Sequence, residues 1–410
     1  MAADPLAHLA DQLDQLDREG LRRHAREPVA AGTLSFCSND YLGLAARPAP
    51  PVASGSGASR LIAGEHDEHR RLERAFATWL GAEDALAFAS GYAANVGALS
   101  ALAGPRDVIV SDALNHASLI DGARLSRARV AVVPHGDVGA VARALADRNE
   151  ARAWVVVESY YSMDADGPDL ADLRGICDRH GAALYVDEAH ALGVLGPRGR
   201  GRCAEAGIVP DVLVGTLGKA FGSQGAFVMG RTVLREWLWN RARSFVFSTG
   251  LAPVSAAAGM RALQTVIDEP ALAARVRDLS ERLREGLVAA GAVRAGTHAT
   301  GPSTTQPGLA PLAAPAPALL GFGHVVPIVL GTPARALRWA ASMREQGIEV
   351  HAIRPPTVPA GASRIRMTLT AAHSAADVDR AVAAFAVAAR RERLEESDRG
   401  RATERAGDQT

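Results

Sequence analysis

The sequence contains few cysteines and has no excess of charge of either sign. Its 410 residues include three cysteines, Cys37, Cys177 and Cys203, and none of them is spaced as a CxxC pair. This sparse, odd set argues against a disulfide framework and a cysteine-ligated metal site, and it indicates a reducing compartment. Lysine plus arginine and aspartate plus glutamate both number 45, so the net charge is zero. Nucleic acid and anionic membranes are therefore disfavoured as partners, and a small molecule or a locally matched protein is favoured.

Long apolar runs are also missing. The first 25 residues lack the apolar core of a signal peptide, and Leu6, Leu9, Leu13 and Leu16 recur instead at the spacing of an amphipathic helix. No stretch is long enough to cross a bilayer. The sequence therefore predicts a cytoplasmic protein that contacts no membrane.

The middle of the chain alternates between strand-like and helix-like segments. Residues 151–159, 182–190 and 210–216 are short apolar runs, and 169–181 has helical spacing and ends in glycine. Strands and helices that alternate through short loops predict an α/β fold with a mostly parallel central sheet. The strand-like runs at 324–331 and 363–370 flank a helical segment, which predicts a smaller C-terminal α+β unit.

The expected domain organisation follows composition along the chain. Residues 295–323 are rich in Pro, Ala, Gly and Thr, which indicates a flexible insertion, and the last residues are charged and poor in apolar side chains. The expected parts are an N-terminal helical arm and strand (1–50), a large α/β domain (51–255), a C-terminal domain that carries the insertion (256–390) and a disordered tail (391–410).

One lysine has unusual neighbours. Lys219 lies in "GTLGKAFGSQGAF", residues 215–227, among four glycines that let other groups approach the backbone. It is either a solvated lysine on a loop or an amine to which a group is attached. Ligands of parallel α/β sheets bind where strands end and helices begin. The candidate residues at or near such places are Gly91, Tyr92, His116, Ser162, Asp187, His190 and Thr216.

Each of these residues also has an ordinary structural explanation. Asp187 could cap the next helix, and the histidines could be partly buried side chains. Together, however, they supply a lysine for a Schiff base, a carboxylate for a ring nitrogen, a helix start for a phosphate and a ring for stacking. Pyridoxal 5′-phosphate (PLP) needs this combination.

The chain resembles the α-oxoamine synthases, PLP enzymes of aminotransferase fold type I. The resemblance extends from about residue 20 to 390 and includes, in the family's order, the stretches "SNDYLGLA", "GSGASRLIAGEHDEH", "SGYAAN", "NHASLIDGARLSRA", "SMDAD", "VDEAHALGVLGPRGRG", "GTLGKAFGSQGAF", "FVFSTGLAP" and "IRPPTVPAGASRIRMTLTAAH". So many matches in one order are specific. The chain departs from the family by a shorter segment at 45–54, a longer one at 295–323, and Ala191 at a usual glycine or serine.

The resemblance implies a role for each matching residue. Lys219 would bind PLP covalently, Asp187 would pair with the ring nitrogen, and His116 would stack on the ring. The remaining cofactor contacts would come from His190 and Ser162 at the ring hydroxyl, from Gly91, Tyr92 and Thr216 at the phosphate, and from Ser248 and Thr249 at the phosphate of the other subunit of a homodimer. Arg366 would bind the amino-acid carboxylate, and Arg22 and Thr357 would contact the acyl substrate. No metal is expected.

The resemblance also implies a reaction. The stretches "RPPTVPAG" and "LTAAH" are most like the family member that condenses L-alanine with a pimeloyl thioester, of coenzyme A or of acyl carrier protein, in biotin biosynthesis. Two alternatives remain at this point. A sister synthase would use glycine to form 5-aminolevulinate or 2-amino-3-ketobutyrate, and a non-catalytic binding protein would keep only the fold. The second is disfavoured because both Lys219 and Asp187 are present.

Overall fold

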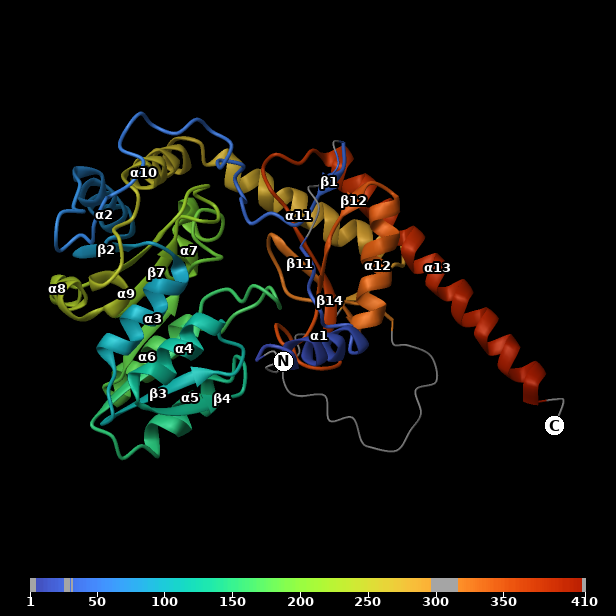
Figure 1. Cartoon of the computed structure of the whole chain (residues 1–410), viewed down its shortest axis with the longest axis horizontal. Helices are drawn as coiled ribbons and strands as arrows, with labels where there is room; N and C mark the ends of the chain where they lie inside the picture. The colour runs from blue at the N-terminus through green and yellow to red at the C-terminus, as the bar shows by residue number, and fades with distance from the viewer. Residues whose placement is uncertain (1–4, 26–29, 31, 296–315, 408–410) are drawn as a thin grey trace.

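A seven-stranded sheet is the centre of the larger unit in the computed structural model, which describes residues 5–25, 30, 32–295 and 316–407 (Figure 1). Only β8 is antiparallel to its neighbours, and every other pairing in this sheet is parallel. This confirms the predicted α/β class. The strands lie in the order β2 (Asp84–Phe88), β8 (Ala226–Gly230), β7 (Val212–Thr216), β6 (Ala183–Asp187), β5 (Arg152–Glu158), β3 (Asp107–Asp112) and β4 (Arg129–Val133).

Helices cover both faces of this sheet, because its strands are apolar on both sides. One face packs against α3 (Gly91–Leu102), α4 (Ala117–Ser126), α8 (Thr232–Arg241) and α9 (Arg243–Val246). The other face packs against α2 (Asp67–Leu80), α5 (Val138–Ala146), α6 (Leu170–His180) and α10 (Pro253–Asp268). The short elements η1 (Pro197–Gly199) and α7 (Gly201–Glu205) follow β6.

The register of the parallel strands brings polar residues together at one edge. Glu158, the last residue of β5, pairs with Asp187, the last residue of β6. Asp187 in turn pairs with Val214, two residues before Thr216 ends β7. The carboxyl ends of three neighbouring strands therefore form one polar edge, which is where parallel sheets bind ligands.

A five-stranded sheet forms the smaller unit. Its strands lie in the order β13 (His351–Ile353), β14 (Ser363–Thr368), β11 (Val325–Gly331), β10 (Ala318–Leu319) and β9 (Arg294–Ala295). Helices α11 (Ala271–Ala289), α12 (Pro333–Glu345) and α13 (Ala375–Gly407) accompany it. Among the described residues, no helix is both long and apolar enough to cross a membrane.

The N-terminal segment is joined to this smaller unit. After α1 (His8–Arg18), β1 (Leu34–Ser35) pairs in parallel with β12 (Ile348–Glu349). Farther on, the backbone N–H groups of Thr368 and Ala371 donate to the carbonyls of Phe36 and Tyr41, at 2.8 Å each. The segment expected as a separate arm thus shares its backbone hydrogen bonds with the C-terminal unit.

The domain limits differ from the expected ones in three places. The expected boundary at 255 falls inside α10, which packs on α2 through a shared apolar core. The ends of the expected insertion form β9 and β10, and its residues 296–315 lie outside the described residues. The expected disordered tail continues as helix α13 to Gly407, in line with its many Ala, Arg and Glu residues, which favour helix.

Candidate active site

Lys219 lies in the turn that follows β7, beside the polar edge of the sheet. The side chain is half-buried, and burial lowers the pKa of Lys219 to about 8, although the charges of Asp187 and Glu158 oppose this shift. Lys219 is also the only lysine in the sequence, since the other 44 of the 45 basic residues are arginines. An amine with this pKa is partly unprotonated near neutral pH and can act as a nucleophile.

Asp187 is held in one orientation from two sides. Its Oδ2 accepts a hydrogen bond from Asn95 Nδ2 at 2.7 Å, and its Oδ1 accepts one from the backbone N–H of Ala189 at 2.8 Å. Asn95 lies on α3, and the hydroxyl of Tyr185 donates to its Oδ1 at 2.8 Å. Asn95 was not identified from the sequence. It is the only asparagine in the otherwise small and apolar segment 91–102, and this could have indicated a buried polar contact.

Glu158 is a second carboxyl group at this edge that sequence reasoning missed. It is buried, and this burial, together with the charge of Asp187, raises the pKa of Glu158 to about 8. Its Oε1 accepts the backbone N–H of His116 at 2.6 Å. Glu158 is therefore mostly protonated at neutral pH and orients the start of α4. Like Asp187, it ends a strand-like apolar run, and this position could have indicated a second carboxyl group at the site.

The two predicted histidines have different surroundings. His116 caps α4, its Nδ1 lies 2.8 Å from Ser118 Oγ, and the residue is exposed. His190 is buried, and its Nδ1 lies 2.6 Å from the hydroxyl of Tyr41. Burial lowers the pKa of His190 well below its ordinary value, so this ring is neutral.

The start of α3 and the end of β7 form a small polar cradle. Ser90 caps α3, its Oγ accepting the N–H of Ala93 at 3.1 Å, and Gly91 begins the helix. A side chain added to Gly91 would lie 3.8 Å from Thr216 Oγ1, so glycine leaves the first turn open beside that hydroxyl. Free N–H groups of a first helical turn attract anions. The hydroxyl of Tyr92 instead donates to Asp121 on α4, at 2.5 Å.

Arg366 on β14 projects toward the same site from the smaller unit. It is buried, its Nε donates to the carbonyl of Ser162 at 2.7 Å, and its Nη2 donates to Asn39 Oδ1 at 3.1 Å. Ser162 thus contacts the predicted carboxylate clamp through its backbone. A guanidinium fixed in this way is preorganised for a carboxylate.

A cavity of about 870 Å³ extends from Arg366 between the N-terminal segment and the smaller unit. Arg22 lines it but forms an ion pair with Asp17 at 2.5 Å, whereas Arg23 Nη2 donates to Thr357 Oγ1 at 3.4 Å. The predicted pair, Arg22 and Thr357, thus lines the same cavity, and Arg23 contacts Thr357 directly. The cavity is lined by Asp17, Gly20, Arg22, Arg23, His24, Cys37, Asn39, Met163, Leu337, His351, Ala352, Ile353, Arg354, Thr357 and Arg366.

Ser248 and Thr249 lie in the segment between α9 and α10. Among the described hydrogen bonds, none joins either residue to the groups around Lys219. The segment is nevertheless fixed, because the N–H of Gly250 donates to the carbonyl of Ala58 at 2.9 Å and Ser56 Oγ donates to the carbonyl of Leu251 at 2.6 Å. Residues 56–58 thus position the predicted phosphate-binding pair.

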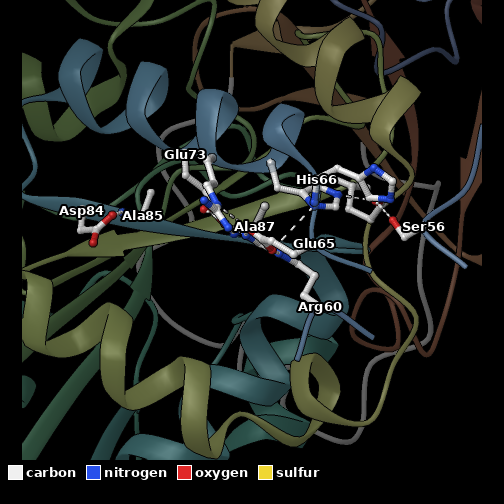
Figure 2. A network of polar contacts seen from close by, with 11 residues as sticks. Ser56, Arg60, Glu65, His66, Glu73, Asp84, Ala85 and Ala87 are labelled. Carbon is white, nitrogen blue, oxygen red and sulfur yellow. Dashed lines mark hydrogen bonds and ion pairs between the residues drawn. The ribbon is translucent and has the colours of Figure 1, made fainter. Parts of the chain in front are cut away.

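A buried charge network holds this support in place (Figure 2). Arg60 is 3% exposed, and its guanidinium pairs with Glu65, at 2.5 Å from Nε, and with Glu73. Glu73 Oε1 also accepts the backbone N–H of Ala87 on β2, at 2.7 Å. The network connects the 56–66 segment, helix α2 and the central sheet.

Replacing Arg60 by methionine should lower stability strongly, because it leaves Glu73 buried without its cation. Removing one member of a buried ion pair costs about 3–5 kcal/mol, so the midpoint of thermal unfolding should fall by at least about 5 °C. The matched control is Arg129→Met, since Arg129 pairs with Glu150 at the surface and such pairs contribute at most about 1 kcal/mol. Equal midpoints for both variants would contradict the structural role of Arg60.

Comparison with known proteins identifies the class. The family model of the class I and II aminotransferases matches residues 31–385. In structure the chain is similar to the serine palmitoyltransferase of Sphingomonas wittichii, with a TM-score of 0.82 and 28% identity over 96% of this chain and 100% of the other. A serine palmitoyltransferase solved with PLP gives a TM-score of 0.81 and 26% identity over 94% and 98% of the two chains. The chain therefore belongs to the class I and II aminotransferase family.

Curated relatives make the resemblance more specific. The chain is 45% identical to the 8-amino-7-oxononanoate synthase of Anaeromyxobacter dehalogenans, over 94% of this chain and 96% of the relative. It is 46% identical to the enzyme of the same name from Mycolicibacterium smegmatis, over 90% and 92%. The resemblance to 8-amino-7-oxononanoate synthase found in the sequence is thereby confirmed.

Proposed function

We propose that the chain is a PLP-dependent acyltransferase that condenses L-alanine with a pimeloyl thioester to 8-amino-7-oxononanoate, with release of CO2 and the carrier thiol, in biotin biosynthesis. The observation that carries this proposal is the arrangement of Lys219, Asp187 and Arg366, whose charges act on one another at the ends of the strands. The similarity to 8-amino-7-oxononanoate synthases supports the same function. Small molecules are the substrates. Coenzyme A and acyl carrier protein both remain as the carrier.

The residues at the sheet edge fit PLP. Lys219 offers an amine, Asp187 offers a carboxylate anchored by Asn95, and the open first turn of α3 at Gly91 offers N–H groups for a phosphate. When bound, PLP supplies an electron sink for a carbanion at the amino-acid α-carbon. His116 is exposed beside this edge and would stack on the cofactor ring.

Each side chain of the site would then have a separate role in the reaction. Arg366 would hold the carboxylate of the amino acid and so orient the bonds at its α-carbon. Lys219 would hold the cofactor and take up the α-proton at Nζ. Asp187 would keep the ring nitrogen protonated, with its orientation fixed by Asn95 and Ala189. The cavity beside Arg366 would take the acyl chain, with Arg22, Arg23 and Thr357 in its wall.

The capture of PLP by the cofactor-free enzyme should accelerate as the pH rises. Only the unprotonated amine attacks an aldehyde, and burial lowers the pKa of Lys219 to about 8 from 10.5. The rate should therefore rise about tenfold per pH unit below pH 8 and level off above it. Stopped-flow absorbance after mixing with PLP measures this rate. A rate that keeps rising to pH 10 would show an ordinary lysine.

A homodimer would complete the site. Ser248 and Thr249 lie on a partly exposed segment beside Phe247, whose side chain is 73% exposed, and Tyr92 is 49% exposed. We propose that this surface meets a second copy and that Ser248 and Thr249 reach the phosphate held by that copy. Sedimentation of the enzyme with and without the substitution Phe247→Asp tests this, since the charge should dissociate the dimer.

A competition assay tests the substrates. Alanine, glycine and serine would be offered together with pimeloyl, succinyl, acetyl and palmitoyl thioesters, on both carriers, and the products read by mass spectrometry. Alanine should be preferred over glycine by about 10–200-fold, the worth of one methyl group in an apolar pocket. Glycine with a succinyl or acetyl donor as the best pair would instead identify a sister synthase.

A further inference from the structure

Tyr41 connects three parts of the molecule at the edge of the proposed active site. Its side chain is 0% exposed, and its hydroxyl lies 2.6 Å from Nδ1 of His190 in the larger unit. Its ring meets the ring of His324 edge-on, at 4.2 Å between centroids and 70° between planes. Its carbonyl accepts the N–H of Ala371 from the smaller unit at 2.8 Å. The backbone and the ring of Tyr41 are thus held by the smaller unit, and its hydroxyl contacts His190 of the larger unit.

The direction of the hydrogen bond follows from the groups present. The hydroxyl can donate to His190 Nδ1 at 2.6 Å or to Asn39 Oδ1 at 3.3 Å. The contact to His190 is favoured because 3.3 Å is longer than an ordinary hydrogen bond from a hydroxyl to an oxygen, whereas 2.6 Å is short. Burial raises the pKa of Tyr41 to about 12, so the phenol keeps its proton.

The surroundings of His190 keep its ring neutral. The groups that act on it are Lys219, Arg366, His324 and His116, all basic, and burial adds to their effect in lowering the pKa of His190. A neutral imidazole has one N–H and one acceptor nitrogen. If Nδ1 accepts from Tyr41, the hydrogen of the ring is on Nε2.

We propose that Tyr41 is a positioning residue that fixes His190 in the tautomer with hydrogen on Nε2, so that His190 presents a donor to the reaction site. This rests on the proposed function, because the donor acts on the ring hydroxyl of bound PLP. A fixed donor stabilises the negative form of that oxygen. Without the Tyr41 hydroxyl, Nδ1 loses its donor and both tautomers become accessible.

The tautomer can be measured directly in the full-length enzyme. Nitrogen-15-labelled histidine gives distinct NMR shifts for the two tautomers, and the spectrum of His190→Asn assigns the signal of His190. The unsubstituted enzyme should show hydrogen on Nε2, and Tyr41→Phe should show a mixture. The matched control is Tyr160→Phe, since Tyr160 is equally buried and donates to the carbonyl of Phe322 at 2.5 Å. Hydrogen on Nδ1 in the unsubstituted enzyme would overturn the proposal, whether or not the variants fold.

A second readout tests the consequence for the holoenzyme. The pH at which the visible absorbance of bound PLP changes should rise by about half a unit in Tyr41→Phe, the worth of part of one hydrogen bond. The same substitution should cause no shift in the His190→Asn background, and Tyr160→Phe should cause none in either. An unchanged midpoint in Tyr41→Phe would overturn the proposal. An enzyme that binds no PLP would refute the proposed function, while the NMR measurement would still decide the role of Tyr41.

Discussion

The enzyme with alanine in place of Lys219 should form no measurable product. Lys219 is expected both to hold PLP and to take up the α-proton, and a positioned acid–base group alone contributes about 10²–10⁴-fold to a rate. The loss of both roles should lower turnover by at least about 10⁴-fold. Product formation is measured by mass spectrometry with saturating alanine and pimeloyl thioester.

Borohydride reduction gives a second test of this lysine. Because Lys219 is the only lysine in the sequence, the reduced cofactor can be attached to only one side-chain amine. Peptide mapping should place it on residues 215–227 in the unsubstituted enzyme and nowhere in Lys219→Arg, which keeps the charge but forms no Schiff base. Attachment to the α-amino group alone, or turnover in Lys219→Arg, would contradict the assignment.

Asp187→Asn should retain the fold and lose about two to three orders of magnitude in turnover. The amide oxygen can accept from only one of the two donors, Asn95 Nδ2 and the Ala189 N–H, so one hydrogen bond is lost. The amide also has no charge to hold a proton on a ring nitrogen. The loss of one preorganised electrostatic contact of this kind costs about 2.7–4 kcal/mol in the transition state.

The control for this variant is Asp84→Asn, since Asp84 begins β2 at the opposite edge of the sheet. Its turnover and its melting midpoint should both equal those of the unsubstituted enzyme. Asp187→Asn should still unfold cooperatively, with a midpoint lower by at most a few degrees because one hydrogen bond is lost. It should differ strongly from the control in turnover and in the visible spectrum of bound PLP. Normal turnover in Asp187→Asn would mean that this carboxylate serves only as a cap.

The ends of the strands were the part of the site best predicted from the sequence. The run "ALYVD" predicted a strand that ends in a carboxylate, and the structure ends β6 at Asp187. Likewise "DVLVGT" predicted a strand before Lys219, and β7 ends at Thr216. Such predictions succeed because apolar runs and glycines are local features, and parallel sheets collect ligands at one edge.

The residues behind the catalytic groups could not be found in the same way. Asn95, Glu158 and Tyr41 act through contacts with residues that are distant in the sequence. The separations are 92 positions for Asn95 and Asp187, 42 for Glu158 and His116, and 149 for Tyr41 and His190. Nothing in the local sequence states which partner a buried polar side chain has. The same limit applies to the neighbours Arg22 and Arg23. The sequence does not indicate that Arg22 pairs with Asp17 and that Arg23 contacts Thr357.

The expected domain limits were less accurate than the expected elements. Composition alone suggested an arm, an insertion and a tail, whereas the structure pairs β1 with β12 and β9 with β10. Two-residue strands carry no periodicity that a sequence could reveal, and their existence depends on edges provided by distant segments.

The pairing of β1 with β12 also sets an order of events during synthesis of the chain. Leu34 pairs with Ile348, and the carbonyl of Tyr41 accepts its hydrogen bond from the N–H of Ala371, which is synthesised much later. At about 5–20 residues per second, a ribosome needs tens of seconds or less to pass from the first of these partners to the second, and during this time the large sheet can form. The N-terminal segment must therefore stay undocked, with Phe36 and Tyr41 uncovered, until nearly the whole chain has emerged. Completion of the site is thus a late step, and nascent chains stalled before residue 348 should expose this segment to proteases or chaperones.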